Sequence, residues 1–337
     1  WLEGHPNAEL RGGWKYYLDE AEQEPEVDAQ LAKLREEYKS IKPEEIKVID
    51  PCMGSGHILV YAFDVLMQIY TSAGWNQREA VQSILKNNLY GLDIDDRAAQ
   101  LAYFAVMMKA RQYNRRILNG ENTCHVYAIQ ESNSINRAHF KFFGAGLSDL
   151  EKNTAKMQLE GLLDILTDAK EYGSILNVPE YNWDLLRRFV GGINDEAQVS
   201  FENAGVEQTA EELQKLIDLG ETMARKYWVT CTNPPYRGLK DVNEELNDYS
   251  KKNYPVSKAD LSTIFMEKTV QISKQNGFVA MINIPIWLNK STLSDLRKKL
   301  LNQITFVNLL DFDRGVFGSD FGTTSFVLKC GSEPQYI

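Results

Sequence analysis

The sequence predicts an α/β protein built on a mostly parallel sheet of seven strands, with an antiparallel last strand and a helical insertion. Three observations support this fold class. Short β-branched runs alternate with helical segments over the first 135 residues, the alternation stops over residues 136–226, and it resumes at residue 227. Strands that alternate with helices in this way form parallel sheets with crossover helices.

The first half begins with an acidic segment, residues 14–40, for which we predict a helix, most clearly in "DAQLAKLREEYKS". The run "IKVID" is then a short strand, followed by a glycine-containing turn and an apolar helix ending near Tyr70. A second helix, "QREAVQSILKN", leads into the strand "LYGLDID". The helix "DRAAQLAYFAVMMKARQ" and the strand "TCHVYAIQES" complete this half.

Residues 136–226, the insertion, are predicted to be mostly helical. "MQLEGLLDILTDAKEYGSIL" carries leucines at helical spacing, and "TAEELQKLIDLGETMARKY" opens with Thr209 and Glu212 at the spacing of a capping box. Beyond the insertion we predict the strand "YWVTC", the helix "DLSTIFMEKTVQISKQ", the strand "GFVAMINIP" and the helix "LSDLRKKLLN". Two closing strands, "ITFVNLLDF" and "TTSFVLKC", are joined by a short glycine-rich link, which predicts a hairpin and hence an antiparallel last strand.

The composition is that of a globular protein, with 43% hydrophobic and 25% charged residues. The four cysteines lie far apart without paired spacing, which argues against a disulfide framework or a zinc site. We therefore predict no metal and a reducing, cytoplasmic location. The most apolar stretch, "GFVAMINIPIWL", is too short and too polar to span a membrane, so no membrane partner is expected.

The net charge of −10 is unusual for a protein that binds nucleic acid. The charge is unevenly distributed, however. From residue 226 onward there are 14 lysines and arginines against 11 aspartates and glutamates, a net charge of +3, which leaves −13 for the rest of the chain. The last third is therefore the part best suited to a nucleic-acid partner.

A glycine turn follows the first strand in "VIDPCMGSGHI", where Gly54 and Gly56 precede a helix. Small residues there let a ligand approach the backbone, although an ordinary turn is the alternative. A dinucleotide site would need a third glycine where Leu59 stands, and an acidic residue about 20 positions further on. Asp50, at the strand end, would repel a phosphate and instead suits a ligand with a positive charge, such as an ammonium group.

The second strand ends in "GLDID", which places Asp93 where its carboxylate can accept hydrogen bonds from ribose hydroxyls. Ile94 would then lie against an adenine face. The alternative is a helix N-cap, a role that Asp95 or Asp96 would fill well. Both interpretations can hold, because Asp93 precedes the capping positions.

The third strand end offers Glu131 and Ser132 as contacts to the amino edge of an adenine. Ligands bind at the carboxyl ends of the strands in doubly wound sheets, so the three strand ends should face one crevice. An ammonium group, a ribose and an adenine together describe S-adenosylmethionine better than a phosphate cofactor.

The fourth strand runs into Asn233, Pro234, Pro235 and Tyr236. A turn would explain the prolines but not the tyrosine. The Asn233 side-chain oxygen and the Pro234 carbonyl, aimed by the rigid Pro-Pro backbone, can accept the hydrogens of an exocyclic base amine as methyl is transferred to it. Tyr236 offers a ring face on which the base can stack. We therefore predict a catalytic loop.

The pair "DPCMGSG" and "TNPPY", in this order, resembles the γ-class amino DNA methyltransferases. This resemblance implies a Rossmann-like S-adenosylmethionine-dependent methyltransferase fold. It also implies that Phe265, in "ADLSTIFMEKTV", contacts the cofactor, and that Phe317, in "GVFGSDFGTTSFVLK", sandwiches a flipped base opposite Tyr236. Core packing is the alternative for both phenylalanines. The predicted cofactor residues are then Asp50, Cys52, Gly54, Gly56, His57, Asp93, Ile94, Glu131, Ser132 and Phe265.

The segments "WKYYLDEAEQEPEV" and "DFDRGVFGSDFG" extend the resemblance over most of the chain, to the PglX adenine-specific methyltransferases of BREX phage-defence systems. It implies double-stranded DNA as a partner and is compatible with other defence-system proteins as further partners. We expect a fragment that lacks a helix before Trp1 and a target-recognition domain beyond Ile337. The expected regions are an N-terminal helical segment (1–45), a cofactor-binding half (46–135), the insertion (136–226) and a catalytic half (227–337).

Methylation of adenine N6 in DNA is the leading functional hypothesis. Asn233 favours adenine, because a serine at this position is more typical of N4-cytosine enzymes. A protein glutamine methyltransferase also uses this motif on the same fold, although the long insertion argues against it. A non-enzymatic module that binds cofactor and gates a defence complex is the third alternative.

Overall fold

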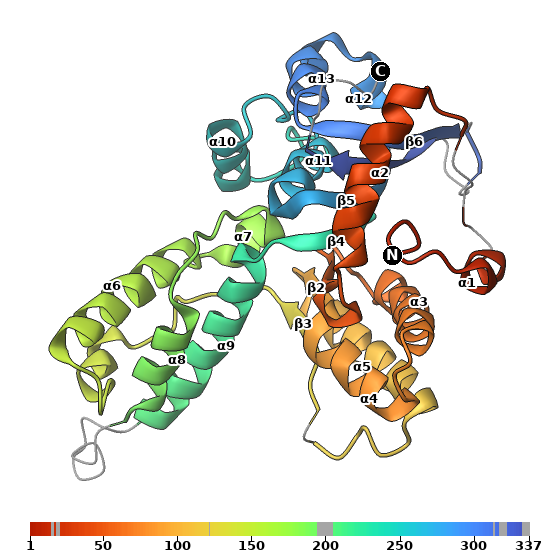
Figure 1. The fold of residues 1–337 in the computed structure, drawn as a ribbon. Helices are drawn as coiled ribbons and strands as arrows, with labels where there is room; N and C mark the ends of the chain where they lie inside the picture. The colour runs from red at the N-terminus through yellow and green to blue at the C-terminus, as the bar shows by residue number, and fades with distance from the viewer. Residues whose placement is uncertain are drawn as a thin grey trace.

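The computed structural model of the chain describes residues 1–14, 17, 21–120, 122–193, 205–312, 314–316 and 322–331. Within this part of the chain, three groups of elements surround one central sheet (Figure 1). Helices α3 to α5 lie together beside one half of the sheet, and α10 to α13 lie around the other half. The insertion projects from the sheet as an arm built mainly of α6, α8 and α9.

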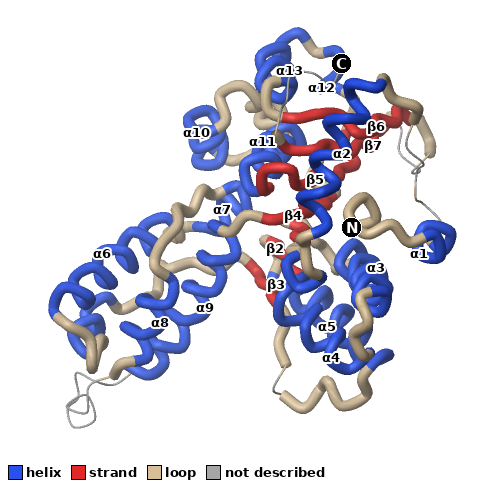
Figure 2. The backbone as a smooth tube through the Cα atoms, viewed as in Figure 1, coloured by secondary structure: helices blue, strands red, loops and turns tan. Residues whose placement is uncertain are grey.

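Seven strands form the sheet in the order β3-β2-β1-β4-β5-β7-β6 (Figure 2). β1 to β5 are mutually parallel, and β7 runs antiparallel to both of its neighbours, β5 and β6. The predicted mostly parallel, seven-stranded sheet with an antiparallel last strand is thus confirmed. The strands are β1 (Val48–Asp50), β2 (Leu89–Asp93), β3 (His125–Ala128), β4 (Tyr227–Thr232), β5 (Ser273–Asn283), β6 (Ile304–Phe312) and β7 (Thr323–Cys330).

Helices cover both faces of the sheet. Alternate residues of each strand point to opposite faces, so each strand contributes side chains to a core on either side. In β2, Leu89 packs with α3, α4 and α5, while Tyr90 and Leu92 join a second core shared with the insertion. A third core joins α11 and α13 to β5 and β7. The helices outside the insertion are α1 (Ala8–Gly13), α2 (Pro25–Lys39), α3 (His57–Ser72), α4 (Gln77–Ser83), α5 (Asp96–Tyr113), α10 (Glu244–Asn253), α11 (Leu261–Ile272), α12 (Ile286–Asn289) and α13 (Ser294–Leu301).

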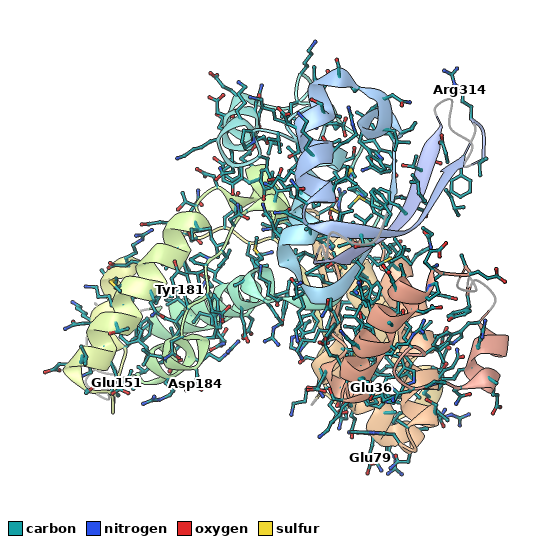
Figure 3. The ribbon with its side chains drawn as sticks, turned by 45° about the horizontal axis from the view of Figure 1, so that its top comes forward. Glu36, Glu79, Glu151, Tyr181, Asp184 and Arg314 are labelled. Carbon is teal, nitrogen blue, oxygen red and sulfur yellow. The ribbon has the colours of Figure 1, made fainter. Side chains whose placement is uncertain are left out.

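The insertion contains α6 (Asp149–Ile165), α7 (Ala169–Tyr172), α8 (Trp183–Gly191) and α9 (Val206–Ala224). Figure 3 shows Glu151, Tyr181 and Asp184 on the arm, far from the sheet. The predicted capping box at Thr209 is wrong, because α9 begins three residues earlier and Thr209 is buried within it. A capping box does occur in the insertion, where Ser148 and Glu151 begin α6.

Two predicted helices have different limits in the structure. The N-terminal acidic helix begins only at Pro25, because proline lacks the N–H that a helix interior needs and is favoured in the first turn. The helix predicted to reach Gln275 ends at Ile272, and Ser273 instead pairs with Tyr227 at the start of β4. Strand pairing therefore overrides helix propensity at this boundary.

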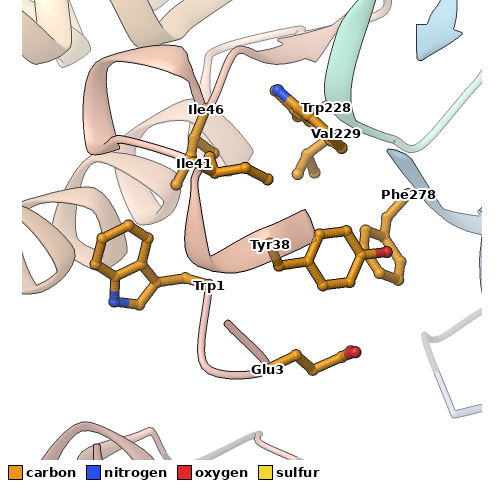
Figure 4. A pocket seen from close by; sticks show the side chains of 8 residues that line it. All are labelled: Trp1, Glu3, Tyr38, Ile41, Ile46, Trp228, Val229 and Phe278. Atoms are coloured by element: carbon orange, nitrogen blue, oxygen red, sulfur yellow. The ribbon is translucent and has the colours of Figure 1, made fainter. Parts of the chain in front are cut away.

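A small cavity of about 70 Å³ lies near the amino end of β4 and beside the middle of β5, next to the end of α2 (Figure 4). Parallel strands place the glycine turn and the proline loop at the opposite, carboxyl edge, so this cavity is not part of the predicted site. Its lining residues are Trp1, Glu3, Tyr38, Ile41, Ile46, Trp228, Val229 and Phe278. Among the residues that the structure describes, no helix combines the length and apolarity needed to cross a membrane.

Candidate functional site

The carboxyl ends of β2, β1 and β4 lie next to one another in the sheet. Asp50, the last residue of β1, is in register with Gly91, two residues before the end of β2. Ile49 is in register with Thr230 of β4. The strand pairing therefore brings Asp50, Asp93 and Asn233 to one edge, although they are widely separated in the sequence.

The glycine turn is held by its own backbone geometry and by Asp93. Gly54 and Gly56 have φ angles of 51° and 82°, in the left-handed region that favours glycine. A Cβ atom on Gly56 would lie 2.9 Å from the Cβ of Ala102 in α5, so the turn packs closely on that helix. The Gly54 N–H donates to Asp93 Oδ2 at 2.9 Å, which joins the first two strand ends. Gly56 and His57 then begin α3.

Asp50 is almost fully buried, at 1% exposure. Its Oδ1 accepts hydrogen bonds from the Cys52 N–H at 3.0 Å and from Thr232 Oγ1 at 2.7 Å. Burial, with a smaller contribution from the nearby Asp93, raises the pKa of Asp50 to about 7. The carboxylate thus connects the glycine turn to the residue that precedes Asn233, and its desolvation favours a cationic ligand group.

We expect Asp50→Asn to remove a pH dependence of stability. With a folded-state pKa of about 7 and an ordinary value of 3.8, folded Asp50 binds a proton that the unfolded chain has released, between those two pH values. The contribution of Asp50 to the free energy of unfolding therefore falls as pH rises through that range, by up to about 1.4 kcal/mol per pH unit. Above about pH 8 this contribution is constant.

Urea unfolding of wild type and Asp50→Asn from pH 5 to pH 9 measures this effect. The stability of Asp50→Asn relative to wild type should increase up to about pH 7 and then level off. A difference that does not change with pH would show that Asp50 titrates at its ordinary pKa.

At the second strand end, the N-cap role is filled by Asp95, and the ribose contact predicted for Asp93 stays a prediction. Asp95 is the N-cap of α5, and its side chain accepts from the Arg97 N–H. Asp93 lies just before the cap, with Oδ1 accepting from the Asp95 N–H at 2.9 Å. Ile94 is 48% exposed, and its predicted contact with an adenine face stays a prediction.

The third strand end is oriented differently from the expectation. The Ser132 hydroxyl is buried and donates to the Leu163 carbonyl of α6 at 2.6 Å. Glu131 Oε1 accepts from the Lys170 N–H at 3.2 Å. Both side chains are therefore engaged with the insertion in this structure, and their predicted contacts to an adenine remain predictions.

The proline loop leaves the sheet directly after Thr232. Asn233 and Pro235 are exposed, Pro234 is buried and Tyr236 is partly buried. The Tyr236 hydroxyl donates to Asn233 Oδ1 and lies 3.1 Å from the Ile282 carbonyl of β5. Burial raises the pKa of Tyr236 to about 12, so the hydroxyl stays protonated at neutral pH and can orient the Asn233 amide.

The sequence predicted two aromatic contacts, Phe265 to the cofactor and Phe317 to the flipped base. Phe265 lies in α11 with 4% exposure, within the core that joins α11 to β5 and β7. Phe317 lies outside the residues that the structure describes.

One contributor to this edge was missed by the sequence analysis. Ser174, in the insertion, donates its hydroxyl hydrogen to the Pro51 carbonyl within the glycine turn at 2.6 Å. Nearby, Lys170 Nζ lies 2.5 Å from Asp96 Oδ2, at the start of α5. No sequence signal marks these contacts, because they join segments more than 70 residues apart.

Two family models match the chain. The model described as Eco57I restriction-modification methylase matches residues 87–317. The model described as N-6 DNA Methylase matches residues 29–140. The first covers the second strand end and the proline loop, and the second covers the glycine turn.

Two curated relatives match almost the whole chain. The adenine-specific methyltransferase BrxX of Escherichia coli O9:H4 (strain HS) is 37% identical over 98% of this chain. The adenine-specific methyltransferase PglX of Lacticaseibacillus casei (strain Zhang) is 36% identical over 94% of it. The matched part is 29% of the first relative and 26% of the second, so the chain spans less than a third of their length.

A solved structure, the ATP-dependent Type ISP restriction-modification enzyme LlaBIII bound to DNA, matches 91% of this chain and 18% of its own. The TM-score is 0.50 at 12% sequence identity, which is a likeness of fold alone. Together with the strand order, it confirms the predicted Rossmann-like fold.

Proposed function

The chain belongs to the Eco57I restriction-modification methylase family, and we propose that it is the methyltransferase part of an enzyme that methylates N6 of adenine in DNA. The observation that carries this proposal is the exposed Asn233 at the end of β4, oriented by Tyr236 and joined through Thr232 to the buried Asp50. The names of both curated relatives support adenine as the base.

The residues at the first two strand ends carry groups suited to S-adenosylmethionine, which is the proposed cofactor. Space beside the glycine turn is open, since a Cβ added to Gly54 would meet no atom within 4 Å. The carboxylate of Asp50 would face the ammonium group, Asp93 the ribose hydroxyls and exposed Ile94 the adenine ring. When bound there, the cofactor supplies a sulfonium methyl group as the electrophile.

The proline loop would hold the target base for in-line attack. An exocyclic amine is a poor nucleophile, because its lone pair is delocalised into the ring. Asn233 Oδ1 and the Pro234 carbonyl would accept the two N6 hydrogens and favour a more tetrahedral nitrogen as the new N–C bond forms. The C–S bond breaks in the same step, and a proton then leaves the nitrogen for solvent. Positioning supplies much of the rate. No general base is required, because the proton can leave after methyl transfer.

Double-stranded DNA is the proposed partner, with the target adenine flipped against Tyr236. The net charge of +3 from residue 226 onward supports contact on the side of the proline loop. Arg237 and Lys240, one and four positions after Tyr236, are exposed and suited to phosphate contacts. Cytoplasmic location and association with other defence proteins belong to the same proposal.

The proposal is tested by expressing the full-length gene with its neighbouring genes in a host that lacks adenine methylation. Modified bases are then mapped by single-molecule sequencing. We expect N6-methyladenine at one sequence motif. N4-methylcytosine in its place would contradict the choice of base, and no modified base at all would favour a protein substrate or a gating role.

A further inference from the structure

A short segment of the insertion, Gly173–Asn177, runs between the glycine turn and the helices that follow the proline loop. We call this segment the strap. On one side, Ser174 donates a hydrogen bond to the Pro51 carbonyl at 2.6 Å, and Ser174 itself is buried at 7% exposure. Pro51 lies between Asp50 and Cys52, two of the residues predicted to bind the cofactor, so the strap contacts the start of the glycine turn.

The other side of the strap is fastened to α10 and α11. Lys268, at 3% exposure, donates from Nζ to the Leu176 carbonyl at 2.7 Å and to Asn177 Oδ1 at 3.0 Å. The Tyr254 hydroxyl, fully buried, donates to the Ile175 carbonyl at 2.6 Å. Three consecutive residues of the strap are thus held by buried side chains from the catalytic half.

The strap also reaches the second strand end. Gly173 has a φ angle of 65°, and a Cβ added there would lie 3.6 Å from Cδ1 of Ile94. Ile94 is 48% exposed, so a side chain at position 173 would lie close to a partly open side chain. The same five residues therefore bond the glycine turn and pass close to the residue proposed to lie against the cofactor's adenine.

We infer that the strap is a wall of the cofactor pocket, contributed by the insertion, and that Ser174 is a positioning residue for S-adenosylmethionine. This inference rests on the proposed function. Ser174 holds the Pro51 carbonyl, and through it the start of the glycine turn. Lys268 and Tyr254 hold the strap at a fixed distance from the proline loop. The insertion thereby joins the cofactor crevice to the catalytic half.

The first test compares Ser174→Ala with Thr209→Val in the full-length protein. Thr209 is a matched control, because its buried hydroxyl bonds His139 Nδ1 at 2.9 Å inside the insertion. Each variant loses one buried hydrogen bond, so similar losses of thermal stability are expected.

Only Ser174→Ala should raise the Kd and KM for S-adenosylmethionine, by about 5- to 10-fold, the equivalent of one such bond. The kcat and the KM for DNA should stay within about twofold of wild type. Equal cofactor affinity in the two variants would overturn the inference.

The second test separates this inference from the proposed function. Amide hydrogen exchange of the full-length wild type is measured with and without S-adenosylmethionine. We expect slower exchange in residues 54–57, 93–95 and 173–177, and no change in α6. Slower exchange in residues 54–57 and 93–95 without slower exchange in residues 173–177 would overturn the inference about the strap and leave the proposed cofactor in place. The cofactor is added at concentrations that saturate other methyltransferases. If exchange is then unchanged in all three segments, both the proposed cofactor and the inference about the strap are overturned.

Discussion

Replacing Asn233 with alanine should lower the rate of methyl transfer about 100- to 1000-fold, the loss measured when one preorganised polar contact to a reacting group is removed. Asn233 is exposed at the end of β4, and its Oδ1 is oriented by the Tyr236 hydroxyl. Among the described residues, its hydrogen bond goes to Tyr236 and not to the glycine turn or Asp93, so the Kd for S-adenosylmethionine should stay within about threefold. Single-turnover methylation of DNA and calorimetric titration of the cofactor measure the two quantities.

Asn289→Ala is a suitable control, because Asn289 is an exposed asparagine at the end of α12, outside the proposed site. It should leave both the rate and the affinity unchanged. A large loss of cofactor affinity in Asn233→Ala would mean that the loop supports the cofactor crevice and does not act on the base.

Asp93→Ala should weaken cofactor binding by about 1.5–3 kcal/mol, or about 10- to 150-fold, the range for hydrogen bonds to a charged group. The structure gives a second reason for a large effect. The two carboxylate oxygens accept from the Gly54 and Asp95 N–H groups, so the substitution also releases the glycine turn from the second strand end. Isothermal titration with S-adenosylmethionine gives the affinity directly.

Asp95→Ser is the matched control for Asp93→Ala. Serine is also a favoured N-cap residue, so α5 keeps its cap while an acidic side chain is lost from the same loop. Its cofactor affinity should equal that of wild type. An unchanged dissociation constant in Asp93→Ala would limit Asp93 to a structural role in the turn.

Sequence patterns were sufficient for the order of the seven strands along the chain and for the antiparallel last strand, but they did not predict α10 or α12. These features follow from local periodicity and from the length of the connections, which are properties of neighbouring residues. The limits of elements were less predictable. Ser273 leaves the predicted helix to pair with Tyr227, and Thr209 lies inside a helix that begins at Val206. In both cases a contact with a distant segment decides the outcome.

In the candidate site, too, some features follow from the local sequence and others from contacts between distant segments. By itself the sequence determined the glycine turn and the proline loop, because each is a short stretch whose backbone geometry depends on its own glycines or prolines. The tertiary structure alone decided that Thr232 bonds Asp50, that Ser132 turns towards the insertion, and that Ser174 supports the Pro51 carbonyl. A hydroxyl can bond any carbonyl or carboxylate within reach, so its partner is set by which strands and helices pack together and leaves no mark in the local sequence.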